Sequence, residues 1–130
     1  MASYPDDLRY TKTHVWVRPR EQLVTVGITE FAADGLGAVG YLELPYAGEL
    51  FKAGDMLLRL SGENGSSTVY MPLIGQVNAA NQTLGDSPGL VNSDPYGAGW
   101  LVRIEPNDVA DAENLMDAAA YEAYVSGDGE

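Results

Sequence analysis

The residue types that most often carry chemistry are scarce in this sequence, which has no cysteine and a single histidine, His14. Disulfide bonds, thiolate metal sites and a cysteine nucleophile are therefore excluded. A metal site built on several imidazoles is excluded as well, so we expect no metal. A Ser-His triad could use only His14, and a general base needs a partner within hydrogen-bond reach. We interpret His14 as a strand residue that packs beside Trp16 and bonds locally.

Three carboxylates close together form a second candidate cluster: Asp108, Asp111 and Glu113. They follow Pro106, where a helix is predicted to begin, and a helix start prefers negative charge. Capping by Asn107 or Asp108 therefore explains the cluster better than acid–base chemistry does. Since neither candidate indicates a catalytic site, we expect a protein that is not an enzyme.

The net charge of −12 comes from 19 acidic and 7 basic residues. It argues against binding to nucleic acid or to an anionic membrane, because both need clustered Lys and Arg. Basic protein partners and simple solubility are both compatible with an acidic surface. The sequence has no apolar run long enough to cross a bilayer, and its acidic residues 1–7 are unlike a signal or transit peptide. We expect a cytoplasmic protein.

Most of the chain is predicted to be β-structure in one domain over residues 1–130, with a core over about residues 8–124 and flexible ends. Apolar and β-branched residues alternate in short runs that are separated by Gly and Pro turns, a pattern typical of a sandwich or barrel. The predicted strands cover residues 10–18, 23–28, 38–44, 49–52, 56–60, 67–71, 75–79 and 99–105.

Two helical regions interrupt the strands. Thr29 is a good N-cap for a helix over residues 30–36, and Gly37 is a suitable stop. A C-terminal helical region follows Pro106, with apolar residues at helical spacing and Asp117 as a cap for its second piece. The tail from Ser126 is predicted to be frayed.

The stretch "LSGENGSSTVYMP" predicts a tight hairpin. Two strand-like runs flank Asn64-Gly65, a dipeptide that suits a type I′ turn because both residues tolerate a positive φ. This is the strongest local turn signal in the chain.

Several stretches together resemble the H protein of the glycine cleavage system: "YTKTHVWV", "VTVGITEFAADGLGAVGYLELP", "YMPLIGQVNAANQTL" and "PGLVNSDPYGAGWLVRI". The resemblance runs from about Leu8 to Tyr124 without large insertions. It implies a mostly β fold of two packed sheets, a barrel-sandwich hybrid related to lipoyl and biotinyl carrier domains. It also implies a lipoyl group on a hairpin-tip lysine, which moves an intermediate between the decarboxylase, aminomethyltransferase and dihydrolipoyl dehydrogenase.

The tip of this hairpin departs from the family pattern. Aligned through Tyr70 and Pro72, the chain has Asn64 where the family has its lysine. Two acidic positions of the family's cleft are replaced as well, by Val15 and Thr68, although carboxylates there would hold an ammonium group. We expect a remodelled cleft and tip made of His14, Val15, Glu63, Asn64, Gly65, Thr68 and Tyr70, with no residue that binds a cofactor.

Three functional hypotheses follow. In the first, the chain is a non-lipoylated H-protein-like domain that takes no cofactor and acts as a binding or scaffold protein, repurposed from glycine cleavage. Its partners would be proteins, such as the glycine cleavage enzymes or their relatives. In the second, it is a genuine carrier with its arm on Lys52 or Lys12, the only lysines of the chain. In the third, it was recruited to a specialised biosynthetic pathway, with His14 and Tyr70 as candidate residues.

Overall fold

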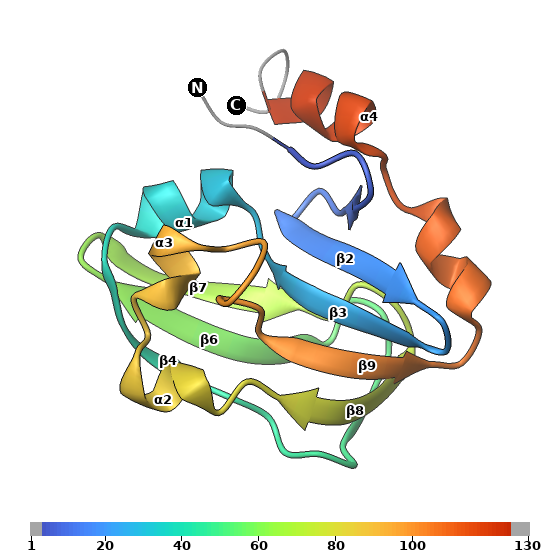
Figure 1. The fold of residues 1–130 in the computed structure, drawn as a ribbon, viewed down its shortest axis with the longest axis horizontal. Coiled ribbons are helices and arrows are strands. Elements are labelled where there is room, and N and C mark those ends of the chain that lie inside the picture. Colours follow the sequence, from blue (N-terminus) through green and yellow to red (C-terminus); the bar gives the residue numbers. More distant parts are fainter. Residues whose placement is uncertain (1–3, 126–130) are drawn as a thin grey trace.

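The structure is a computed structural model that describes residues 4–125, and within them the chain forms two antiparallel β-sheets. Figure 1 shows the sheets as two layers, with short helices at their edges. The six-stranded sheet has the order β1-β2-β3-β9-β8-β5, with β1 Arg9–Tyr10, β2 Val15–Arg20, β3 Leu23–Ile28, β9 Val102–Pro106, β8 Gly75–Ala80 and β5 Leu50–Phe51. The three-stranded sheet has the order β4-β6-β7, with β4 Val39–Glu43, β6 Met56–Gly62 and β7 Gly65–Tyr70.

The helices are short and lie in the connections between strands. They are α1 Glu30–Leu36, α2 Thr83–Asp86, α3 Leu90–Ser93, the 3-10 helix η1 Val109–Asn114 and α4 Ala118–Ala123. In Figure 1, α1 and α3 lie beside the free end of the β6–β7 hairpin, and α4 lies above β2. Across residues 4–125, the structure has no helix with the length and apolar character needed to span a membrane.

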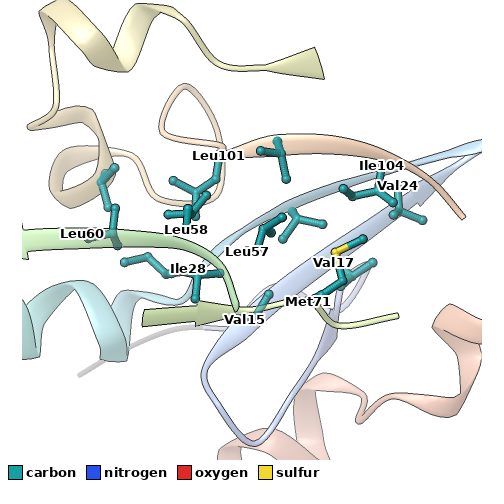
Figure 2. Close-up of a cluster of buried hydrophobic side chains, with 14 of the residues drawn as sticks. Val15, Val17, Val24, Ile28, Leu57, Leu58, Leu60, Met71, Leu101 and Ile104 are labelled. Carbon is teal, nitrogen blue, oxygen red and sulfur yellow. The ribbon is translucent and has the colours of Figure 1, made fainter. Parts of the chain in front are cut away.

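The main core fills the space between the two sheets. Figure 2 shows how it interleaves side chains from both, including Val15, Val17 and Val24 of the large sheet and Leu58 and Leu60 of the small one. These side chains are at most 4% exposed, as expected from the period-2 alternation of half-buried strands. The alternation in the sequence thus places one face of each sheet in the core.

A second, smaller core covers the outer face of β2. Its fully or nearly fully buried members are Leu8, Tyr10, Trp16, Ala118 and Tyr121. The Trp16 indole donates a hydrogen bond from Nε1 to the Pro95 carbonyl, 2.9 Å away. The rings of Tyr10 and Tyr121 stack with their centroids 4.8 Å apart. The first half of β2, residues 15–17, is therefore buried on both faces, and α4 belongs to the folded core.

The predicted fold class is confirmed: a mostly β, two-sheet sandwich with a helix over residues 30–36 and a C-terminal helical region. Thr29 caps α1 as predicted, accepting a bond from the Ala32 N–H. Asp108 caps η1 as predicted, Asp111 lies in the first turn of η1, and Asp117 caps α4 as predicted. The prediction for the tail from Ser126 lies outside the described residues.

One local prediction is wrong, and two short helices were missed. His14 does not lie in a strand but precedes β2 with a left-handed φ of 71°. The Thr11 carbonyl accepts from the His14 N–H, and the Thr11 hydroxyl accepts from the Val15 N–H, which together hold this bend. The short helices α2 and α3 were also not predicted. Each is a single turn held by a buried anchor, Leu84 or Val91.

The packing of Trp16 generates a first prediction. A methyl group at Gly27 would lie 2.5 Å from two carbons of the Trp16 ring, which is too close for any real contact. Since this ring is buried and hydrogen-bonded, we expect Gly27→Ala to lower the free energy of unfolding by about 1–3 kcal/mol. Urea denaturation measures the change. Gly40→Ala in β4 is the matched control, because its methyl group would meet open space; an equal loss in both variants would contradict the prediction.

Candidate functional site

The β6–β7 hairpin ends in a two-residue loop made of Glu63 and Asn64. Gly62 and Gly65 face each other as the last pair of the ladder. The loop therefore lies one residue earlier than the predicted turn at Asn64-Gly65, since Gly65 already belongs to β7. Gly65 has a positive φ, 131°, whereas Glu63 and Asn64 do not. The prediction of a type I′ turn is wrong, since neither loop residue has the left-handed backbone that such a turn requires.

The reason for the displacement is that the tip docks on the C-terminal end of α1. The last four carbonyls of a helix have no donor within the helix and must find one elsewhere. In α1, Asn64 serves two of them: its backbone N–H donates to Leu36 at 2.9 Å, and its side-chain Nδ2 donates to Gly35 at 3.2 Å. Asn64 is thus a capping residue in this structure.

The remaining two carbonyls have their own donors. The Asn92 side chain donates from Nδ2 to the Ala33 carbonyl at 3.3 Å and to the Gly37 carbonyl at 2.8 Å. The Gly37 N–H donates to the Asp34 carbonyl at 3.4 Å. Asn92 also accepts from the Val39 N–H through Oδ1, so its carboxamide fixes the connection from α1 into β4. Sequence reasoning missed Asn92; an amide residue within the apolar "GLVNS" run was the available signal.

Close approach at the tip requires glycine at two positions. A methyl group on Gly62 would lie 2.5 Å from the Leu36 carbonyl oxygen. Gly37 has a φ of 73° and would meet the Glu63 and Asn64 side chains at 3.1 Å. Glu63 adds a bond of its own, because its Oε1 accepts from the Ala38 N–H at 3.3 Å. The tip is exposed to solvent yet held to α1 on several atoms.

The other end of α1 carries a hydrogen-bonded aromatic cluster. The Tyr121 hydroxyl lies 2.7 Å from His14 Nδ1 and 2.8 Å from the Thr29 hydroxyl. The Phe31 ring packs on His14 with centroids 4.7 Å apart. Burial lowers the pKa of His14 below its ordinary 6.5 and raises the pKa of Tyr121. Nearby, the Tyr96 hydroxyl accepts from the Glu30 N–H, and burial raises the pKa of Tyr96 to about 12.

The residues predicted for the cleft and tip fall in separate places. Glu63, Asn64 and Gly65 form the tip at the C-terminal end of α1, whereas His14 lies at its N-terminal end, about 10 Å away along the helix. Val15 is fully buried in the main core. Thr68 and Tyr70 lie on β7 of the small sheet, where Thr68 pairs with Arg59 and Tyr70 pairs with Met56.

The two packed sheets, with a hairpin tip presented beside a short helix, place the chain in the class of barrel-sandwich folds to which lipoyl-type carrier domains belong. A family model described as "Glycine cleavage H-protein" matches residues 8–128, and the chain belongs to this family.

Relatives and a solved structure agree with this assignment. The glycine cleavage system H protein of Halorhodospira halophila is 42% identical over 130 residues, covering 99% of this chain and 100% of the relative. That of Alteromonas mediterranea is 46% identical over 126 residues, covering 96% and 98%. The crystal structure of a glycine cleavage system H protein from Mycobacterium marinum superposes with a TM-score of 0.84 at 30% identity, covering 98% of this chain and 100% of that one.

The expectation that the protein takes no cofactor needs correction. The chain belongs to the glycine cleavage H proteins, which carry a lipoyl group, and so the family contradicts that expectation.

The residues at this particular tip do not fit attachment of that group. An amide link to lipoate needs a primary amine, and Asn64 offers a carboxamide nitrogen that is delocalised and already donates to Gly35. The two lysines of the chain lie elsewhere: Lys12 precedes β2, and Lys52 follows β5. What this tip can do chemically is donate and accept hydrogen bonds.

The tip geometry predicts a high cost for any side chain at position 62. Gly62→Ala would push its methyl group against a backbone carbonyl that cannot rotate away, so we expect a loss of about 1–3 kcal/mol in the free energy of unfolding and faster amide exchange at Asn64. Urea denaturation and hydrogen exchange measure these. Ser66→Ala, on the same exposed hairpin, is the control, and unchanged exchange at Asn64 in both variants would refute the docking argument.

The half-buried His14 predicts a pH dependence of stability. The unfolded chain keeps the ordinary pKa of 6.5, so below that pH it binds more protons than the folded chain does. The free energy of unfolding should therefore fall as the pH drops below 6.5 through the lowered pKa. His14→Asn, which tolerates the left-handed backbone, should remove this part of the decline. Denaturation from about pH 7.5 to about pH 5 tests it; parallel curves for the two proteins would contradict it.

Proposed function

We propose that the chain is a single H-protein-like domain that catalyses no reaction itself and acts through contact with protein partners of the glycine cleavage type. The observation that carries this proposal is the tip. Its position in the fold is that of the family's presented hairpin, while Asn64 uses both its backbone and its carboxamide to cap α1. In this proposal Asn64 is a capping residue that holds the tip against α1.

A contact role is supported by apolar side chains on the small sheet and at β5. Tyr41 of β4 is 59% exposed, Met56 of β6 is 58% exposed, and Leu50 of β5 is 76% exposed. Exposed large apolar side chains are typical of protein interaction sites where they form a contiguous patch. Tyr70 is also exposed and pairs with Met56, so the two side chains share one face of the sheet.

A reconstituted glycine cleavage assay tests the proposal. We expect the wild-type chain to bind the decarboxylase or the aminomethyltransferase in a direct binding measurement. Asn64→Lys restores an amine at the tip. A lipoate ligase should then modify position 64, seen by mass spectrometry of the hairpin peptide, and glycine–CO₂ exchange should rise well above the wild-type rate. The same variant loses the bond to Gly35, which costs roughly 0.5–1.5 kcal/mol of stability.

The control keeps the surrounding charge constant. Lys12→Arg with Lys52→Arg removes both native amines while preserving two positive charges. If the wild type supports exchange at the rate of the modified Asn64→Lys protein, and the double variant does not, the chain is a full carrier that uses Lys52 or Lys12 and the proposal fails. It also fails if the wild type binds none of the enzymes.

A further inference from the structure

Three of the seven basic residues of this acidic chain line one cleft on the large sheet. Arg18 lies on β2, Arg20 ends β2, and Arg103 lies on β9. The ladder register explains their convergence: Arg18 pairs with Thr25 of β3, and Thr25 pairs with Arg103. Paired residues of neighbouring strands point to the same face, so the two arginines flank Thr25 on one side of the sheet.

The other walls of the cleft are polar and aromatic. Trp100 closes one side, and the Arg103 guanidinium lies over its ring, 4.3 Å from the centroid. Asn78 enters from β8 at the point where the register between β8 and β9 shifts, and such a bulge re-aims a side chain. The cleft has a volume of about 460 Å³, which is within the range of small-molecule sites.

The arginines contact the fold mainly through neutral groups: the Arg18 guanidinium lies 5.1 Å from the Trp16 ring centroid, and that of Arg103 lies over Trp100. Within residues 4–125, neither Arg20 nor Arg103 forms an ion pair. Arg18 has a neutral partner in the Tyr96 carbonyl at 2.9 Å, and Asp7, which is 75% exposed, lies 4.0 Å away at the limit of an ion pair. Asp94, an exposed residue, lies next to Gly97 of the cleft lining, and its Oδ2 accepts from the Ala98 N–H.

Guanidinium groups recognise oxyanions through paired, charge-assisted hydrogen bonds. Three of them in one cleft, with the Thr25 hydroxyl between Arg18 and Arg103 and the Asn78 amide on the next strand beyond Arg103, form a set of donors with few acceptors. A concave cleft of this size favours a small molecule over a protein surface, which needs about 800 Å² on each partner.

We propose that this arginine cleft binds a small molecule with at least two oxyanion charges, carried on phosphate or carboxylate groups. The proposal is independent of the hairpin tip and of the proposed function, because none of the residues of the cleft contacts the tip. It gives the chain a ligand site on the large sheet, away from the small sheet on which Tyr41 and Met56 are exposed.

Titration with pyrophosphate and with citrate at constant ionic strength tests the proposal, followed by ¹⁵N–¹H NMR. We expect saturable shifts at the backbone amides of Thr25, Asn78 and Trp100. The first probe represents phosphates and the second carboxylates, and the tighter of the two identifies the source of the oxyanions. Arg20→Gln and Arg103→Gln should each weaken binding about tenfold, which corresponds to about 1.4 kcal/mol.

The matched control is Arg59→Gln, which removes a positive charge from the small sheet and should leave the affinity unchanged. Melting temperatures confirm that each variant is folded. The proposal is overturned if neither probe gives saturable shifts, if Arg59→Gln weakens binding as much as the cleft variants, or if the shifts map outside the cleft. It is also overturned if a short oligoglutamate peptide binds more than about tenfold tighter than both probes, because the site would then suit a protein partner.

Discussion

The C-terminal carbonyls of helix α1 are the constraint on which the arrangement of the functional region depends. A helix of seven residues has few internal hydrogen bonds, so its stability rests on what satisfies its ends. The Asn64 backbone and side chain satisfy two carbonyls, and Asn92 and Gly37 satisfy two more. One helix end therefore fixes the hairpin tip, the entry into β4 and the position of α3 together.

The sequence carried enough information for most of the strands, for helix α1 and for the family, but not for the tip. Residues 23–28 are rich in β-branched residues and form β3, and Thr29 and Gly37 bound α1 by their own local chemistry. The hairpin was predictable from the same kind of signal. Its loop residues were not, because the displacement to Glu63 and Asn64 results from bonds to α1, which lies about 28 positions earlier in the chain.

The same distinction explains the other misses. The left-handed backbone of His14 depends on the hydroxyl and carbonyl of Thr11, and no pattern of polar and apolar residues encodes it. The one-turn helices α2 and α3 have poor intrinsic propensity and are held by burial of one residue each, which sequence periodicity over four residues cannot reveal. The grouping of Arg18, Arg20 and Arg103 depends on strand order, because β9 joins the sheet beside β3 across some 75 positions of sequence. Spacing along the chain gives no sign of that neighbourhood.

The small core on the outer face of β2 has a consequence for the order of folding. The bridge between Tyr10 and Met116, and the stacked rings of Tyr10 and Tyr121, join segments that are more than 100 positions apart. Closing so long a loop costs more entropy than closing the adjacent β2–β3 or β6–β7 hairpins, and it is favourable only once the strands between are in place. The two end segments, around Tyr10 and around Met116 to Tyr121, should therefore be the last parts of the chain to reach their folded positions. They also share one cooperative unit, in which release of either segment uncovers the Trp16 ring.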